Sequence, residues 1–251
     1  MITPVHTRML IQWLVLLLIS AGSLPAQAQS GTVTQHTQER ALPTGLSLPT
    51  LIVGHGTPRG SVIGTPYLDS TWQRGTIRFY RPLSPVTSVD SLAQVLIRLD
   101  LSTYDTEVKA SAQNIRLAKA ASVRSIRFTD AQTGLYVNTR DYAPLPSPLT
   151  GFFEQVAVGS LTLLYYPYLY RIKANYNVAM GTGSAQDELL HKQAWYVAEK
   201  GQVRPFSPGR KALLALMATR QKEIEAYLKQ QQPDLKSRTD LKALFEYYNQ
   251  L

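Results

Sequence analysis

Apolar and polar residues alternate along much of the chain between residues 64 and 206. The clearest segment alternates Ile77 and Phe79 with Arg78 and Tyr80. The same two-residue period recurs in other short segments: residues 95–101, 106–110, 115–117, 123–128 and 135–137. A period of two with polar alternate positions predicts antiparallel strands with one face toward water. We therefore expect residues 64–206 to form an antiparallel β domain.

Two hairpins are predicted toward the end of this region. Residues 152–158 and 161–173 are rich in β-branched and aromatic residues, and the pair Gly159-Ser160 between them suits a tight turn. A further hairpin consists of residues 194–199 and 202–206. Between the two hairpins, residues 174–192 lose the period and contain Gly and Asn, so we expect an exposed loop there.

The hydrophobic period changes from two to 3.6 residues in the last part of the chain, residues 207–251. Apolar residues recur three and four positions apart in three short segments, each preceded by an N-cap candidate: Ser207, Thr219, and Ser237 or Thr239. Short amphipathic helices bury their apolar stripes only by packing on each other or on a sheet. The predicted fold class is α+β, with an antiparallel β-rich body, roll- or sandwich-like, and two to three short C-terminal α-helices packed on it.

The first 28 residues have a different pattern. Arg8 is their only charged residue, an apolar run interrupted only by Gln12 follows over residues 9–19, and the segment ends in Ala26-Gln27-Ala28. A positive start, an apolar centre and an A-x-A end are the three parts of a secretory signal peptide. The run is shorter than the roughly 20 apolar residues that span a bilayer. We expect cleavage after Ala28 and export of a soluble protein to the periplasm or the extracellular medium, without a later transmembrane anchor.

Residues 29–63 are predicted to form a flexible tether. The segment contains Pro43, Pro49 and Pro58 and is rich in Gly and Thr. Its one apolar island, residues 51–53, is long enough for a single edge strand and too short for a core. The expected organisation is thus a signal peptide (residues 1–28), a tether (29–63), a β domain (64–206) and a helical segment (207–251).

The composition restricts the function further. The chain has no cysteine, which excludes a lipid-anchored lipoprotein, disulfides, thiol catalysis and cysteine-ligated metals. The apolar fraction of 44% is that of a folded protein. Cleavage after Ala28 would change the net charge from +9 to +8 (25 basic minus 17 acidic residues), a balance that would favour anionic surfaces such as lipid headgroups or acidic glycans. The basic residues are scattered, with no run of Lys and Arg longer than two, and this pattern is more typical of an ordinary soluble cationic surface. Nucleic acid is not an expected partner of an exported protein.

The chain from Gly64 onward resembles a set of exported bacterial proteins of unknown function. The motifs that carry the resemblance are Gly64-Thr65-Pro66-Tyr67-Leu68 with Trp72 and Gly75, the strands Gly151-Phe152-Phe153-Glu154 and Leu161-Thr162-Leu163-Leu164-Tyr165, and the tail segments Lys211-Ala212-Leu213-Leu214, Lys222-Glu223-Ile224-Glu225-Ala226-Tyr227 and Tyr247-Tyr248-Asn249-Gln250-Leu251. The resemblance implies export and a β-rich body with a helical C-terminus. It implies no activity and no catalytic residue.

Candidate chemistry is sparse. The glycine-rich residues 54–60 lack the following helix that a phosphate loop requires. Glu188 and His191 would share one face of a helix, but one carboxylate and one imidazole do not hold a transition metal tightly, so a surface loop or short helix is expected there. His191 is also the only histidine in the predicted folded part, and no Gly-x-Ser-x-Gly motif is present. We assign no catalytic, metal-binding or cofactor-binding residue and expect no cofactor.

The densest aromatic segment supplies the candidate binding residues, Tyr165, Tyr166, Tyr168 and Tyr170. Tyrosines on a strand contact sugar rings or a protein partner, and they also serve ordinary sheet packing. The function we expect is a non-catalytic module of the cell envelope or a secreted module that binds a protein or glycan. The alternative is a hydrolase that acts on an envelope polymer, which would need a pair of carboxylates in a cleft or His191 beside a Ser or Asp.

Overall fold

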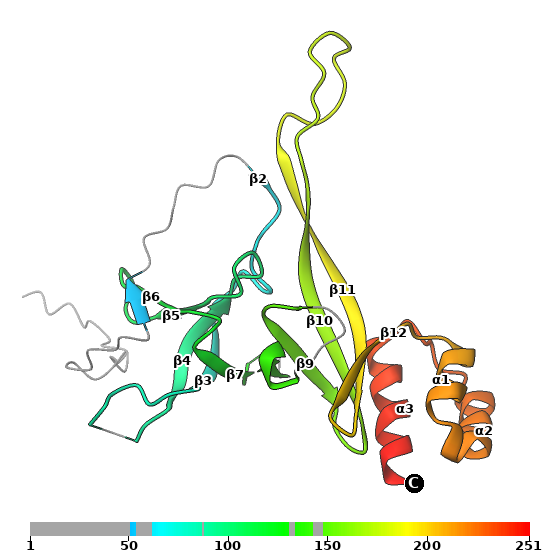
Figure 1. Ribbon diagram of the computed structural model, residues 1–251. Helices are drawn as coiled ribbons and strands as arrows, with labels where there is room; N and C mark the ends of the chain where they lie inside the picture. Colours follow the sequence, from blue (N-terminus) through cyan, green and yellow to red (C-terminus); the bar gives the residue numbers. More distant parts are fainter. Residues whose placement is uncertain (1–50, 54–61, 87, 131–133, 143–147) are drawn as a thin grey trace, which may run out of the picture. The chain divides into compact units, whose positions relative to one another are not determined.

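Figure 1 shows the computed structural model of the chain, which describes residues 51–53, 62–86, 88–130, 134–142 and 148–251. The chain divides into two units, Met1–Glu39 and Arg40–Leu251, and all the described elements belong to the second unit. The predicted signal peptide (residues 1–28) and most of the predicted tether (residues 29–50 and 54–61) lie outside the described residues. No helix in the described ranges combines the length and hydropathy needed to cross a bilayer.

A large antiparallel sheet forms the body of the second unit. Its strands are β1 (Leu51–Val53), β2 (Val62–Ile63), β3 (Gln73–Phe79), β4 (Ser91–Leu99), β5 (Thr106–Lys109), β6 (Ile115–Ala118), β7 (Val123–Phe128), β8 (Gly134–Asn138), β9 (Phe152–Ala157), β10 (Leu161–Ile172), β11 (Asp187–Glu199) and β12 (Gln202–Phe206). The strand order is β1-β6-β5-β4-β3-β7-β8-β9-β10-β11-β12, and β2 pairs with β11 in parallel. The predicted α+β class with an antiparallel β-rich body is confirmed.

The first strands follow the predicted alternation. In β3 the side chains of Ile77 and Phe79 are buried, and the exposed or half-buried positions lie between them. β4 begins earlier than the period suggests, because Gln94 adopts a positive φ of 56° and the β3–β4 register shifts between Gly75 and Ile77. Such a bulge changes the phase of the alternation, so only the part of β4 after Gln94 is visible as a period in the sequence.

The longest hairpin joins β10 to β11. Their register runs without interruption from Leu161↔Glu199 to Ile172↔Glu188, whereas β9 pairs with β10 only at Leu163, Leu164 and Tyr165. The predicted exposed loop over residues 174–192 is therefore wrong in its last third, because residues 187–192 belong to β11. The backbone hydrogen bonds to β10 stabilise this strand although its own sequence shows no alternation.

The helices follow β12. They are α1 (Arg210–Leu216), the 3₁₀ turn η2 (Ala218–Arg220), α2 (Gln221–Gln231) and α3 (Arg238–Gln250), and another 3₁₀ turn, η1 (Thr139–Tyr142), precedes β9. Ser237 caps α3, since its hydroxyl oxygen accepts from the Asp240 N–H at 3.3 Å. The other two predicted caps are wrong, because Gly209 and Arg220 occupy the N-cap positions of α1 and α2.

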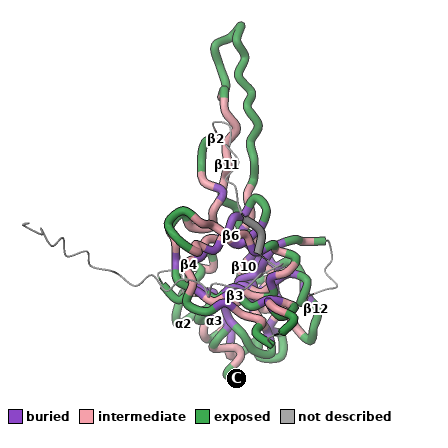
Figure 2. The backbone as a smooth tube through the Cα atoms, turned by 90° about the vertical axis from the view of Figure 1, so that its left-hand side faces the viewer, coloured by how far each residue is buried: buried purple, intermediate pink, exposed green. Residues whose placement is uncertain are grey.

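Alternate residues of β10 and β11 belong to two different cores. Leu164 and Tyr166 join the core of the large sheet, while Leu161 and Leu163 join a second core with the C-terminal helices. The second core also contains, among others, Trp195, Val197, Phe206, Leu213, Ile224, Leu241, Leu244 and Phe245. Both faces of this part of the sheet are thus covered. Figure 2 shows the buried residues in this body and the exposed residues toward the end of the hairpin.

Candidate functional site

The far part of the β10–β11 hairpin leaves the covered body of the sheet. From the strand register, Tyr166, Tyr168, Tyr170 and Ile172 point to one face, and Leu190 of β11 lies opposite Tyr170. The exposed fraction rises from 8% for Tyr166 to 56% for Tyr170 and is 39% for Ile172. We call Tyr168, Tyr170, Ile172 and Leu190 the aromatic stripe.

Tyr166 anchors the stripe in the core. Its hydroxyl donates to the Thr150 carbonyl oxygen at 2.8 Å and accepts from the Tyr104 hydroxyl at 2.9 Å. Its ring stacks on Tyr168 with centroids 6.0 Å apart. Burial raises the pKa of Tyr166, so it stays a neutral phenol at physiological pH. These contacts fix the orientation of Tyr168 and leave the rest of the stripe in contact with solvent.

Tyr165 is not part of this surface. It points to the opposite face of the hairpin, where its ring meets Trp195 edge-on at 5.1 Å and the Arg238 guanidinium lies 5.4 Å from its centroid. Its hydroxyl donates to the Gln193 side-chain oxygen at 2.8 Å. Of the four tyrosines predicted to bind a partner, the structure thus places Tyr165 in the packing of α3, Tyr166 in the main core, and Tyr168 and Tyr170 on the stripe.

Residues 174–186 connect the two strands and contain no charged side chain. Their large apolar residues are Tyr176, Val178 and Met180, which are 50%, 82% and 72% exposed. We call these three residues the apolar tip. Every residue from 170 to 183 is exposed. The sequence predicts a loop here but does not single out its apolar residues, although the charge-free stretch between Lys173 and Asp187 is visible in it.

An ion pair closes the base of this loop. The Arg171 Nε donates to Asp187 Oδ2 at 2.6 Å, and the Ala174 N–H donates to Asp187 Oδ1 at 2.7 Å. The hydrogen bonds from the Ala174 backbone and from Arg171 hold the pKa of Asp187 below its usual range. Asp187 therefore stays ionised and keeps both strands in register where the loop begins.

His191 and Glu188 do not form a metal site. They lie on a strand, where residues three apart point to opposite faces, so the expected loop or short helix is wrong. The His191 Nε2 lies 2.9 Å from the Thr65 carbonyl oxygen. No group of three or more His, Cys, Asp or Glu that would hold a metal ion occurs among the described residues. The glycine-rich residues 54–60 lie outside them.

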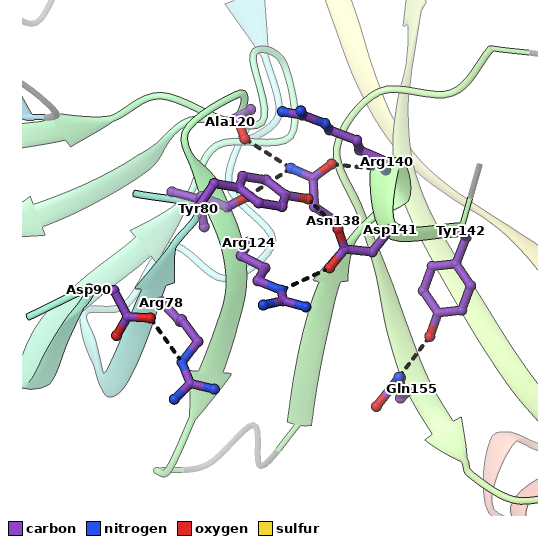
Figure 3. A network of polar contacts seen from close by, with 11 residues as sticks. Arg78, Tyr80, Asp90, Ala120, Arg124, Asn138, Arg140, Asp141, Tyr142 and Gln155 are labelled. Atoms are coloured by element: carbon purple, nitrogen blue, oxygen red, sulfur yellow. Dashed lines mark hydrogen bonds and ion pairs between the residues drawn. The ribbon is translucent and has the colours of Figure 1, made fainter. Parts of the chain in front are cut away.

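A polar network around η1 serves to connect strands. The Asn138 amide donates to the carbonyl oxygens of Ala120 and Val123 at 2.9 and 2.8 Å, as Figure 3 illustrates. Asp141 accepts from the Tyr80 hydroxyl at 2.7 Å and from the Arg124 Nε at 3.2 Å. Burial, together with the hydrogen bond to Asp141, raises the pKa of Tyr80 to about 12. These contacts connect residues of β7 and β8 and the end of β3 with η1, so we assign the network a structural role.

Comparison with known proteins adds no function, since no protein-family model, curated protein or solved structure matches the chain. The candidate site therefore depends on its own geometry, which is an exposed aromatic and apolar surface on a hairpin anchored in two cores.

Proposed function

We propose that the protein is an exported, non-catalytic binding module that works in the cell envelope or outside the cell and binds a protein partner through the aromatic stripe. The single observation that carries this proposal is the row Tyr168, Tyr170, Ile172 and Leu190, which continues the buried Tyr166 onto an exposed hairpin face. Exposed aromatic residues beside aliphatic ones, on a rigid support, are typical of the central residues of protein interfaces.

The aliphatic members of the stripe favour a protein over a glycan. The aliphatic members Ile172 and Leu190 supply apolar contact area and no hydrogen bonds to sugar hydroxyls. The positive net charge would speed association with an acidic partner of either class.

Addition of a partner strand to the hairpin is less well supported than contact through side chains. Beyond Tyr165, β10 pairs with no strand on its β9 side within the described residues. Pro167 lacks an N–H group, and Arg171 places a charge farther along this strand. Proline and basic residues are common means of protecting an edge strand from pairing.

Crosslinking in cells would test the stripe. We expect the wild-type protein to capture an envelope protein that the double variant Tyr170→Thr, Leu190→Thr no longer captures. Threonine keeps the β-propensity of both positions. The matched control is Val158→Thr, because Val158 is 65% exposed and lies at the β9–β10 turn. With the purified partner, the double variant should weaken binding by about tenfold or more.

Two results would refute the proposal. If the stripe variant and the control capture the same proteins with the same affinity, the stripe is not the binding surface. Cell fractionation with mass measurement tests export separately. A chain that is found in the cytoplasm with residues 1–28 intact would contradict the signal peptide and the location that we propose.

A further inference from the structure

The apolar tip has the polarity of a segment that enters a lipid bilayer. Val178 and Met180 are 82% and 72% exposed, and Tyr176 is half exposed. No charged residue lies between Lys173 and Asp187. A protruding loop that presents apolar side chains on a charge-free segment suits a fluid apolar phase, which adapts to its shape.

Several backbone groups of the tip are hydrogen-bonded within the loop. The N–H groups of Asn175 and Asn177 donate to the carbonyl oxygens of Ser184 and Thr182 at 2.9 and 2.8 Å. The Asn177 side-chain oxygen accepts from the N–H groups of Ala179 and Met180 at 3.0 and 3.2 Å. Polar backbone groups enter an apolar phase at low cost only when they have such internal partners.

The side chains of Asn175 and Ser184 make further hydrogen bonds within the loop. The Asn175 side-chain oxygen accepts from the Ser184 N–H at 2.9 Å, and the Ser184 hydroxyl donates to the Gln186 carbonyl oxygen at 2.8 Å. The side chains of Asn175, Asn177 and Ser184 are thus turned toward the loop's own backbone, while Tyr176, Val178 and Met180 are exposed. The loop presents its apolar residues in a pre-organised conformation.

The charged residues begin at the base of the loop. Arg171 on β10 forms an ion pair with Asp187 on β11, and Lys173 and Glu188 are their near neighbours in sequence, so this band carries both signs of charge. The extended chain from Lys173 to Val178 reaches at most about 16 Å at about 3.3 Å per residue. Interfacial segments enter a bilayer by about 5–10 Å. Val178 and Met180 would therefore reach the acyl boundary while the charged band remains among the headgroups.

We propose that the apolar tip inserts into the interfacial layer of a phospholipid bilayer and holds the protein at the membrane surface, and that the positive net charge strengthens binding to anionic lipids. This inference goes beyond the proposed function and concerns different residues from the aromatic stripe. A protein partner for the tip is the competing outcome, and it would be recognised by binding that does not need lipid.

Vesicle binding tests the proposal. The protein is expressed with its natural N-terminus and mixed with vesicles of phosphatidylethanolamine and phosphatidylglycerol, and the bound fraction is measured by co-sedimentation. We expect the double variant Val178→Asp, Met180→Asp to bind about tenfold to a hundredfold more weakly, because each carboxylate would have to enter the apolar layer.

The β3–β4 loop offers a matched control. Val86 and Val89 are 91% and 52% exposed, so Val86→Asp, Val89→Asp makes the same change in net charge at another exposed loop. We expect this control to bind vesicles less than about threefold more weakly than the wild type, because only the attraction to anionic lipid is reduced. Because all variants share the same N-terminal region, any contribution of that region to binding cancels in the comparison.

Insertion itself has a separate readout. The chain contains no cysteine, so Met180→Cys and Val86→Cys each give a single labelling site for an environment-sensitive fluorophore. We expect a blue shift on vesicle addition for the label at position 180 and none at position 86. Absence of vesicle binding, equal losses in the two Asp variants, or no shift at position 180 in the bound protein would each overturn the proposal. The stripe variant Tyr170→Thr, Leu190→Thr should still bind vesicles, so the two proposals can fail independently.

Discussion

The most constrained side chain outside the hairpin is Glu154. Its carboxylate, 2% exposed, accepts from the Tyr136 hydroxyl at 3.1 Å and pairs with Arg238, which is the first residue of α3. Burial raises the pKa of Glu154, and Arg238 and the Tyr136 hydroxyl oppose this rise. The charge is therefore stable in the sheet only because a helix supplies its partner.

Replacing Arg238 by Met should destabilise the protein in a pH-dependent way. The carboxyl of Glu154 has a higher pKa in the folded chain than the ordinary value of 4.5, so the unfolded chain loses this proton first as pH rises. Stability contributed by the group therefore falls as pH rises above that value. Without Arg238 the pKa of Glu154 in the folded chain is higher still. The free energy of unfolding therefore falls further as pH rises, and the loss reaches about 2–3 kcal/mol at pH 7. Urea unfolding between pH 4 and pH 8 measures this loss.

The double variant Arg238→Met, Glu154→Gln is the control for this mechanism. It removes the buried charge, so the difference from wild type should no longer grow with pH. A loss in Arg238→Met that is the same at pH 4 and pH 7 would mean that Arg238 acts through packing on Tyr165 rather than through Glu154.

At the scale of elements, the sequence predicts strands well where one face of the strand is exposed to solvent. β3, β5 and β7 alternate because each has one buried face, and their bounds agree with the period to within about two residues. The first part of β11 was missed, since Leu189 and Leu190 are adjacent apolar residues and their strand depends on pairing with β10. Non-local pairing of this kind leaves no local period.

The candidate site was predictable only in part, for related reasons. A period of two already separates Tyr165 from Tyr166, Tyr168 and Tyr170. Which of the two faces is covered depends on α3 and on Tyr104, which are distant in sequence. The starts of α1 and α2 differ from the predicted caps because neither N-cap residue, Gly209 or Arg220, makes a side-chain capping bond. A rule based on capping side chains does not detect such starts.

The end of α3 is held to the β9–β10 turn by one side chain. The Asn249 Nδ2 donates to the Leu161 carbonyl oxygen at 2.9 Å, and its Oδ1 accepts from the Leu161 N–H at 3.0 Å. We expect Asn249→Ala to lower the free energy of unfolding by about 1–2 kcal/mol, because both backbone groups lose their partner. Gln250→Ala, at an exposed neighbouring position, should change it by less than about 0.5 kcal/mol. Equal effects of the two substitutions in urea unfolding would contradict this role of Asn249.

At the scale of the whole molecule, one continuous sheet joins the two cores. The strands of the main core continue without a break into β10 and β11, and the C-terminal helices cover the opposite face of these strands. A chain without disulfides depends on such packing for its stability. Loss of the helical core should therefore also destabilise the strands at the other end of the sheet.

Phe245→Ala tests this coupling. Phe245 is fully buried in the helical core, with its ring centroid 5.9 Å from that of Phe206. Removal of the ring should cost about 3–5 kcal/mol. In the chain that begins at Gln29 and carries Trp195→Phe, Trp72 is the remaining tryptophan. It lies beside Arg98 of β4 and reports on the distant part of the sheet. We expect Phe245→Ala to shift the urea midpoint seen by Trp72 fluorescence as much as the midpoint seen by circular dichroism, because the sheet unfolds cooperatively. A Trp72 midpoint that stays unchanged would show instead that the helical core and the first strands unfold as separate units.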